Sequence, residues 1–337
     1  MRTLIISDLH LGGRLGHDVL ARPRPLARLL DALDGIDRLV LLGDTVELTE
    51  GRSQQAMNVA EPVFRAIGSQ LGSGRELVLV PGNHDAPLVR SWVRRHREQL
   101  QVQTSVELSA TPALARIASW LKPAQVQVRY PGVWLAPRVW ATHGHYLNRH
   151  LMPESTYGVL RGLFGALPWS GASPGDYEQG SRPSLVGATR LLPRPVATLL
   201  QDMSDLARAS TMPLARRHLL HRRIAPLTSA VLGQQMQRAS IPALAHVVRQ
   251  LGVEADWVVF GHVHRLGPID DDDPQQWRIA GGGAAIVNTG SWLYEPLLVH
   301  RATPPHPYWP GGAVRLEDGR APQAIGLLDD LRPRDLR

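Results

Sequence analysis

Short apolar runs alternate with amphipathic segments through roughly the first third of the chain. The runs TLIIS, DRLVLLG and ELVLVPG are separated by stretches at 25–34 and about 54–71, whose apolar positions recur with the period of a helix. Such alternation predicts parallel strands joined by right-handed crossovers, with helices on the faces of the sheet. The pattern therefore indicates an α/β fold.

The hydrophobic pattern then changes twice along the chain. VQVRY and RVWATHGHYLN predict an antiparallel hairpin or meander, and ADWVVFGHVH, AAIVNTGSW and AVRLE predict strands nearer the C-terminus. Between these groups the chain is first rich in Pro and Gly, and then helical in pattern with breaks at prolines. We therefore expect one α/β domain at 1–146 and 252–325, a mostly helical insertion or cap at 147–251, and a tail at 326–337.

Composition narrows the class of protein. The chain has 337 residues, 43% of them hydrophobic and 20% charged, which is typical of a globular protein with a large core. No apolar run approaches the roughly 20 residues of a membrane span, and TLII is too short for a secretory signal. Cysteine is absent, so a metal site here would use nitrogen and oxygen ligands. We expect a cytoplasmic protein, with peripheral contact at the inner face of the membrane left open.

The formal net charge of +7 comes almost wholly from arginine, since Lys122 is the only lysine. Guanidinium groups suit phosphate, nucleic acid or an anionic membrane surface. Arginine-favouring codon usage would also spread such groups without purpose, and we expect it to explain most of the excess. The local cluster RRHLLHRR at 216–223 could face an anionic membrane or substrate.

Polar residues with metal-binding chemistry follow the predicted strands, in SDLHLGG, LGDTVE, PGNHD, THGHY and FGHVH. Strands of open α/β sheets present their carboxyl ends at one edge, so these side chains are expected to converge. Carboxylate, amide and imidazole groups suit Mn, Fe, Zn or Mg. A pair of such cations about 3.5–4 Å apart can clamp the attacking and leaving oxygens of a displacement at phosphorus. The candidate residues are Asp8, His10, Asp44, Asn83, His84, His143, His262 and His264.

The ordered series D-x-H, GD-x-x-E, GNHD, H-G-H and GH-x-H resembles the calcineurin-like metallophosphoesterase family, over residues 1–146 and 252 to about 300. The resemblance implies a four-layer α-β-β-α sandwich with the helical segment inserted. It also implies two divalent cations, with manganese expected first and Fe, Zn or Mg as alternatives. The first cation would be held by Asp8, His10, Asp44 and His264. The second would be held by Asp44, Asn83, His143 and His262, with Asp44 bridging and a hydroxide between the metals as the nucleophile in line with the leaving group.

By the same resemblance, His84 would stabilise charge on the phosphoryl group or protonate the leaving oxygen. An imidazole in that role needs an orienting carboxylate. We favour Glu47 over Asp85, because the side chains of adjacent residues usually point apart. A surface glutamate that caps a turn is the alternative interpretation of Glu47. His145 would lie on the same side as His143, where it could contact phosphate or support a ligand.

The substrate is less constrained. Leu48 and Pro81 stand where the protein Ser/Thr phosphatase branch has arginines, which argues against a phosphoprotein. SDLHLG together with Glu47 resembles the UDP-diacylglucosamine hydrolases, which cleave a lipid-linked pyrophosphate beneath a helical cap. We therefore expect a dinuclear phosphoester hydrolase acting on a small or lipid-linked phosphodiester or pyrophosphate, with an anionic membrane as a further partner of the insertion. A nuclease acting on DNA or RNA is a less favoured alternative, and a non-catalytic scaffold less favoured still, because no ligand is missing.

Overall fold

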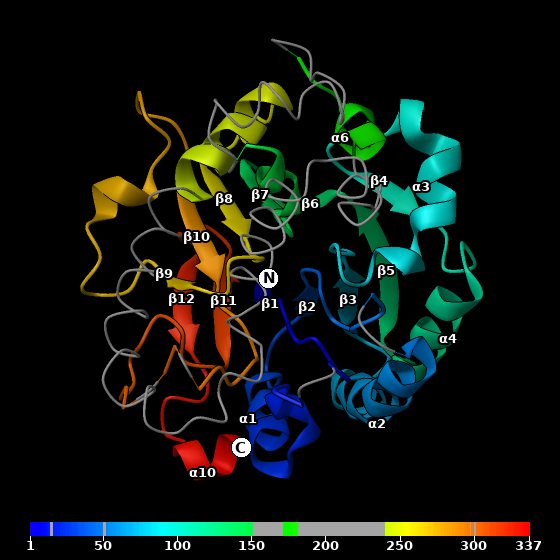
Figure 1. Cartoon of the computed structure of the whole chain (residues 1–337), viewed down its shortest axis with the longest axis vertical. Coiled ribbons are helices and arrows are strands. Elements are labelled where there is room, and N and C mark those ends of the chain that lie inside the picture. Colours follow the sequence, from blue (N-terminus) through cyan, green and yellow to red (C-terminus); the bar gives the residue numbers. More distant parts are fainter. Residues whose placement is uncertain (14–15, 50–51, 151–170, 181–239, 297, 300) are drawn as a thin grey trace, which may run out of the picture.

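The strands of the computed structural model form two sheets that pack face to face, with helices on both outer sides (Figure 1). The structure describes residues 1–13, 16–49, 52–150, 171–180, 240–296, 298–299 and 301–337. Side chains from the facing sides of the two sheets share one buried apolar cluster, which includes Ile5, Val40, Val259 and Val287. The α/β class and the two-sheet architecture expected from the sequence are therefore confirmed.

The first sheet has seven strands in the order β12-β11-β1-β2-β3-β5-β4. Neighbouring strands from β1 to β5 in this order are parallel, whereas β11, β12 and β4 pair antiparallel with their neighbours. The strands are β1 (Arg2–Ile6), β2 (Arg38–Leu41), β3 (Glu76–Leu79), β4 (Thr104–Val106), β5 (Gln125–Tyr130), β11 (Gly312–Glu317) and β12 (Gln323–Gly326).

Helices cover the outer face of this sheet. Leu4 and Ile6 of β1 pack into the same cluster as Leu29 and Phe64 of the covering helices, whereas Ile5 faces the other sheet. A strand buried on both faces reads as a continuous apolar run, which explains TLIIS. The α-helices of the first sheet's side are α1 (Pro23–Ala32), α2 (Ser53–Leu71), α3 (Arg90–His96), α4 (Pro112–Trp120) and α10 (Pro333–Leu336).

The second sheet has five strands in the order β6-β7-β8-β10-β9. Its outer face is covered by α6 (Pro174–Gly180) and by a helical stretch at 240–250, through Tyr177, Leu244 and Val248. The strands are β6 (Gly132–Ala136), β7 (Val139–Thr142), β8 (Trp257–Phe260), β9 (Leu266–Gly267) and β10 (Ala285–Thr289). Short 3-10 helices in the described residues are η1 (Val19–Ala21), η2 (Ala86–Leu88), η3 (Arg97–Gln99), η4 (His145–Arg149) and η7 (Pro274–Trp277).

The predicted pairing of VQVRY with RVWATHGHYLN is wrong. The first segment is β5, which lies beside β3 in the first sheet, and the second contains β7 in the other sheet. The antiparallel partner of β7 is β6, in the short run GVWLA that the hydrophobic pattern left unassigned. Pro131 separates β5 from β6, and because proline has no N–H to donate to a ladder, the chain leaves one sheet there and enters the other.

The ends of the expected insertion and the expected tail both pack on the domain. Most of the insertion, including the cluster at 216–223, lies outside the described residues, whereas α6 and the stretch 240–250 lie against the second sheet. The last residues form α10, and Leu328 and Leu336 are buried in the same core as α1, so this stretch is not a loose tail. Among the helices that the structure describes, none is both long and apolar enough to cross a membrane.

Candidate metal centre

The candidate residues lie in the loops that follow β1, β2, β3, β7 and β8, and the structure brings these loops together. The carboxyl ends of the parallel strands meet at one edge of each sheet, as expected for open α/β sheets. Within each of three groups, the potential ligand atoms lie within 4.8 Å of one another. The groups are Asp8–His10–His264, His10–Asp44–His84 and Asp44–His143–His262.

The backbone at this edge is strained. Among the described non-glycine residues outside the site, only Arg138 and Arg301 have positive φ angles. Such a conformation costs an L-residue about 1 kcal/mol or more, and it persists only where the surrounding structure imposes it. The strain therefore marks a place where side chains are held for a purpose. The site residues with positive φ are Asp8 (55°), His10 (43°), Asp44 (52°), His262 (70°) and His264 (56°).

Glycines in the motifs allow the loops to approach so closely. A Cβ atom on Gly43 would meet the imidazole of His143, and one on Gly82 would meet the carboxylate of Asp44. Gly43 also has a φ of 88°, a conformation that glycine adopts without strain. The glycines of GD-x-x-E and GNHD are thus required by the side chains of neighbouring loops.

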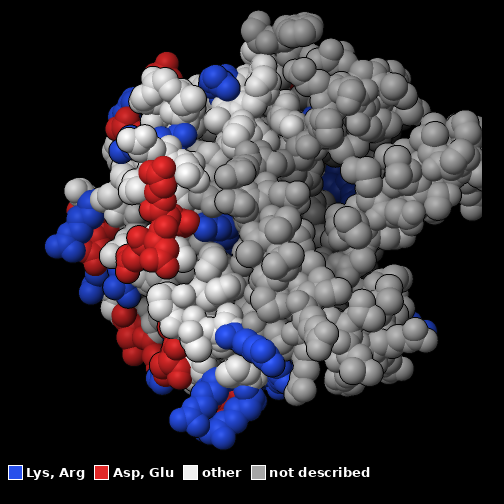
Figure 2. Space-filling view, turned by 60° about the vertical axis from the view of Figure 1, so that its left-hand side comes forward, with Lys and Arg blue, Asp and Glu red and all other residues white. Residues whose placement is uncertain are grey.

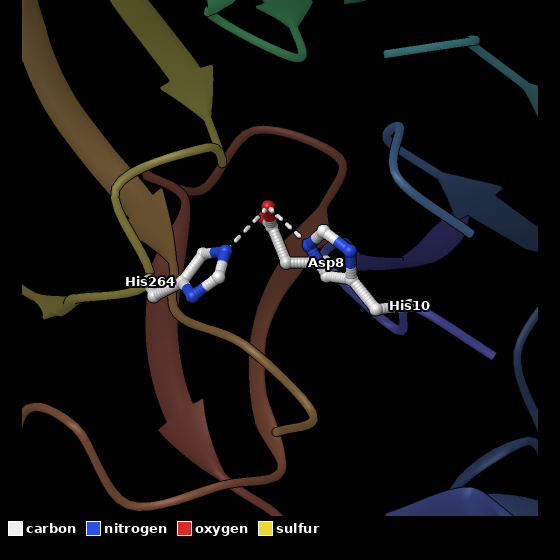
Figure 3. A group of neighbouring side chains, drawn as sticks. All are labelled: Asp8, His10 and His264. Carbon is white, nitrogen blue, oxygen red and sulfur yellow. Dashed lines mark ion pairs between the residues drawn. The ribbon is translucent and has the colours of Figure 1, made fainter. Parts of the chain in front are cut away.

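One carboxylate oxygen of Asp8 accepts hydrogen bonds, and the other lies near two imidazoles (Figure 3). Its Oδ2 accepts hydrogen bonds from the backbone N–H of His262, at 2.9 Å, and from the hydroxyl of Ser7. Its Oδ1 lies 3.3 Å from Nε2 of His264 and 3.9 Å from Nε2 of His10. The two imidazoles come from distant parts of the chain and point at the same oxygen.

The tautomer of His10 decides whether the atoms around Oδ1 of Asp8 can bind a cation. Nδ1 of His10 lies 3.2 Å from Oε2 of Glu47, a carboxylate that can only accept, so Nδ1 carries the proton and Nε2 keeps its lone pair. Nε2 of His10 and Oδ1 of Asp8 are both buried, and neither has a hydrogen-bond partner among the described residues. Burying facing acceptors is unfavourable unless a positive charge lies between them. The donor set therefore fits a divalent cation.

The second half of the centre is built around His143. Nδ1 of this imidazole lies 3.0 Å from the carbonyl oxygen of Leu42 and donates to it, so Nε2 is the nitrogen that is available to a cation. That nitrogen lies 3.1 Å from Oδ2 of Asp44 and 3.2 Å from Oδ1 of Asn83. An imidazole nitrogen and two oxygens thus converge here, and His262 lies in the same group as Asp44 and His143.

Asp44 lies between the two halves. Its Oδ1 accepts a hydrogen bond of 2.8 Å from the backbone N–H of His84. Its Oδ2 lies 3.1 Å from Nε2 of His143 and 3.7 Å from Nε2 of His10, so a single oxygen faces both groups. Burial works against the ionised form of Asp44, yet His143 holds the pKa of this carboxyl well below its usual range. In the same way, burial opposes a charged His143, but the Asp44 carboxylate raises the pKa of His143 to about 10. The centre attracts positive charge.

Glu47 contacts both His84 and His10. Its Oε2 lies 2.6 Å from Nδ1 of His84, and its Oε1 accepts hydrogen bonds from the N–H of Thr49, at 3.0 Å, and from the Thr49 hydroxyl, at 2.8 Å. Glu47 is 3% exposed, so the interpretation as a surface cap is wrong. Burial raises the pKa of Glu47, but hydrogen bonds from His10 and His84 outweigh it and lower this pKa far below its ordinary value.

Asp85, the other carboxylate considered for His84, faces a different direction. It accepts hydrogen bonds from the N–H and hydroxyl of Thr45, at 2.8 and 2.7 Å, and from the N–H of Gly82, at 2.5 Å. These bonds fix the GNHD loop against the loop after β2. Asp85 therefore supports the backbone that carries Asn83 and His84.

Several polar contacts of the site were not identified from the sequence. Thr49 holds Glu47, and Oδ1 of Asn148 lies 2.9 Å from Nε2 of His262. Thr49 has a weak signal in its position two residues after Glu47, but Asn148 has none, since it lies in η4 and reaches a loop that follows β8. Asn288, in β10, donates to the carbonyl of Gly261 at 2.8 Å and so supports the loop that carries His262.

Comparison with known proteins agrees with this centre. The family model described as calcineurin-like phosphoesterase matches residues 1–177, more than half of the 337-residue chain. No curated protein matches the sequence. A dimetal phosphatase from Danio rerio is similar at 13% identity and a TM-score of 0.36, covering 97% of this chain and 99% of that one. A cold-active protein-tyrosine phosphatase of a psychrophile Shewanella sp. is similar at 12% identity and a TM-score of 0.30, covering 96% and 80%.

A mutant of a cold-active protein tyrosine phosphatase gives nearly the same values, 12% identity and a TM-score of 0.31, with 96% and 80% covered. Structural similarity at these TM-scores carries no argument about this protein. The match to the family model is of a different kind, because it spans the first four of the motifs that converge at the edge of the sheets. The chain belongs to the calcineurin-like phosphoesterase family, and it is a metal-dependent hydrolase of phosphoesters.

Proposed function

We propose that the centre binds two divalent cations, manganese by preference, and hydrolyses a small or lipid-linked phosphodiester or pyrophosphate. The observation that carries the proposal is the pair of buried atoms, Oδ1 of Asp8 and Nε2 of His10, which lie 3.9 Å apart and have no hydrogen-bond partner in the described part of the chain. The first cation would be held by Asp8, His10, Asp44 and His264, and the second by Asp44, Asn83, His143 and His262.

Cations bound here would supply positive charge to the phosphoryl oxygens and lower the pKa of a bound water. The chain itself supplies a proton donor. Nδ1 of His84 lies 2.6 Å from Oε2 of Glu47, so Glu47 orients the ring and the other ring nitrogen, Nε2, faces away from this carboxylate. The His84 side chain is 26% exposed, whereas the Glu47 side chain is 4% exposed. We therefore assign proton donation to the leaving oxygen to His84, and its orientation to Glu47.

The surroundings favour a small substrate over a phosphoprotein or a nucleic acid. Leu48, the residue after Glu47, is buried and supplies no charge at the position where the protein Ser/Thr phosphatase branch has an arginine. On the described part of the face in Figure 2, Lys and Arg side chains lie among Asp and Glu side chains and form no single basic stripe. A nuclease needs such a stripe to track the phosphate backbone.

The segment 147–251 is proposed as a cap for the substrate, and its arginine-rich part as a contact with the inner face of the membrane. In support, described parts of this segment lie close to the centre: α6 and the stretch 240–250 pack with Tyr146 and Leu147 of η4, which begins two residues after His143. A lipid-linked substrate held between cap and centre would place a cytoplasmic enzyme at that surface.

Reconstitution with single metals tests the function. Cation-free protein is supplied separately with Mn, Fe, Zn or Mg and assayed with bis(p-nitrophenyl) phosphate, p-nitrophenyl phosphate and a nucleoside diphosphate ester that contains a pyrophosphate bond. We expect the fastest turnover with Mn on a diester or pyrophosphate, and its loss in His84→Ala. Asp256→Asn, which changes an exposed carboxylate paired with Arg138, serves as the control. Turnover of single-stranded DNA that falls steeply with salt, or no turnover with any metal, would contradict the proposal.

A further inference from the structure

A second buried polar cluster lies beside the centre and is built by α6. Glu178 of this helix reaches Tyr130, at the end of β5, and Tyr146, in η4. Both tyrosines are buried, with 3% and 4% exposure. Oε1 of Glu178 accepts a hydrogen bond from the hydroxyl of Tyr130 and another, of 2.7 Å, from the hydroxyl of Tyr146. The cluster continues to His145, whose Nε2 lies 3.4 Å from the Tyr130 hydroxyl.

The directions of these hydrogen bonds follow from proton counting. Oε1 of Glu178 receives two hydroxyl donors and is therefore an acceptor, whether or not Oε2 carries a proton. A tyrosine hydroxyl has one proton to give. The proton of Tyr130 is committed to Glu178, so its oxygen can only accept from Nε2 of His145. Nε2 of His145 therefore carries the proton of this imidazole.

The other nitrogen of His145 is left as an acceptor. Its Nδ1 is buried and has no hydrogen-bond partner in the described part of the chain. A proton there would be a buried donor without an acceptor, which is strongly unfavourable. The ring centroid of His145 lies 5.7 Å from that of His143, because Gly144, at a φ of 106°, turns the chain between them. A fixed lone pair thus lies next to the Asp44–His143–His262 half of the centre.

We propose that Glu178 and Tyr130 are positioning residues that hold His145 as its Nε2–H tautomer, so that Nδ1 accepts a hydrogen bond from a water or hydroxyl group of the phosphoester complex. This inference rests on the proposed function. Its consequence is that α6, which lies in the segment between the H-G-H and GH-x-H motifs, completes the site. The residue that contacts substrate is His145, and Glu178 acts only through Tyr130.

The tautomer can be measured directly by NMR with 15N-labelled histidine in cation-free full-length protein. His145→Gln identifies the signals of His145. We expect one tautomer in the wild type, with a proton on Nε2 and none on Nδ1, and a mixture of both tautomers in Tyr130→Phe. Tyr146→Phe is the matched control, since it removes the other hydroxyl from Glu178 and should leave the His145 tautomer unchanged. A proton on Nδ1 in the wild type, or an unchanged tautomer in Tyr130→Phe, would overturn the inference.

Glu178→Ala and Glu178→Gln provide a second test if Tyr130→Phe does not fold. Glu178→Ala removes the acceptor of the Tyr130 hydroxyl, which can then donate to Nε2 of His145. The proton of the His145 imidazole should therefore shift to Nδ1. Glutamine keeps an oxygen acceptor at the same place and should restore Nε2–H. If both variants lost the Nε2–H tautomer of His145, or if neither lost it, this tautomer would not depend on an acceptor oxygen at residue 178. Either result would contradict the inference.

Kinetics separate this inference from the proposed function. Tyr130→Phe should lower kcat about tenfold and change KM less than about twofold, the size expected for one misplaced hydrogen bond, whereas Tyr146→Phe should stay within about twofold. Wild-type kcat in Tyr130→Phe would refute the inference and leave the function standing. If the wild-type protein hydrolysed no phosphoester with any metal, the function would fail, while the NMR result would still decide the tautomer.

Discussion

Two buried ionic groups meet at adjacent residues, His264 and Arg265, and they differ in how their charges are satisfied. The guanidinium of Arg265 donates to both carboxylate oxygens of Asp272, at 2.6 and 3.0 Å, and lies 5.1 Å from the ring centroid of Trp277. His264 instead points at Oδ1 of Asp8, an oxygen for which the described residues supply no hydrogen bond.

The difference shows that burial and charge do not by themselves identify a functional site. Arg265 and Asp272 supply donors and acceptors to each other, and the N–H of Ile269 adds a further hydrogen bond of 2.9 Å. That pair is complete within the chain and holds the loop after β8. At the centre, Oδ1 of Asp8 and Nε2 of His10 are buried without a hydrogen-bond partner among the described residues, so the chain satisfies this group only in part.

The largest expected effect separates the two groups by activity. Asp44→Asn should lower kcat/KM by roughly 10³-fold or more, because the carboxylate that faces both halves of the centre is lost. Asp272→Ala should leave the kcat/KM of the folded protein nearly unchanged, but should lower the free energy of unfolding by about 3 kcal/mol, since it leaves a buried guanidinium unpaired. Steady-state kinetics and urea unfolding measure the two effects. Equal losses of activity in both variants would remove the distinction between the two groups.

Backbone strain gives the next largest effect. Gly43 and Gly72 both have positive φ, of 88° and 66°, but only a Cβ on Gly43 would meet another residue, the ring of His143. Gly72→Ala should cost about 1–2 kcal/mol from φ alone. Gly43→Ala should cost more than about 3 kcal/mol or displace His143, and should abolish hydrolysis.

Thermal unfolding of the two glycine variants, followed by titration with Mn, checks this prediction. Gly72→Ala should still be stabilised by the cation, and Gly43→Ala should not. A Gly43→Ala variant with wild-type cation binding would mean that the loops after β2 and β7 are less tightly packed than the structure indicates.

The sequence was sufficient to place the candidate ligands at one edge, for a physical reason. Each motif follows an apolar run and ends it with Gly, Asp or Asn, and parallel strands present such ends together. The same pattern could not assign β6, because GVWLA is short and alternates poorly. It also could not identify Glu178 or Asn148, since a polar residue that acts through a contact distant in sequence leaves no periodic signal.

Cation binding should stabilise the centre and leave the Arg265–Asp272 pair unaffected. Mn at about 100 times its dissociation constant should raise the free energy of unfolding by about 2.7 kcal/mol in the wild type and in Asp272→Ala. His264→Ala should lose most of that increment. Calorimetric scans with and without a chelator provide the measurement. The same increment in His264→Ala would place the cation elsewhere.

The pH dependence of this binding has a defined sign. Without a cation, the Asp44 carboxylate raises the pKa of His143 to about 10, although burial opposes the charge, so His143 carries a proton at neutral pH. A cation must displace that proton, and its apparent affinity should therefore rise with pH, by up to about tenfold per pH unit below pH 10. An affinity independent of pH between 6 and 8 would show that His143 is not among the ligands.

The carboxylate of Glu47 resembles that of Asp272 in having both oxygens engaged, but it contacts the two imidazoles that we propose as a cation ligand and as the proton donor. Glu47→Gln keeps the size of the side chain, yet its amide has only one acceptor oxygen for the two imidazoles and the two donors of Thr49. We expect kcat to fall by about 10- to 100-fold with KM little changed, as for other residues that orient metal-bound or catalytic histidines. Thr49→Val, which removes only the hydroxyl donor to Oε1, should lower kcat about fivefold. The decisive result is a larger decrease of kcat in Glu47→Gln than in Thr49→Val when both are measured at saturating Mn. Glu47 also contacts His10, a proposed cation ligand. If excess Mn restored the kcat of Glu47→Gln to the wild-type value, Glu47 would act through cation affinity and not through His84.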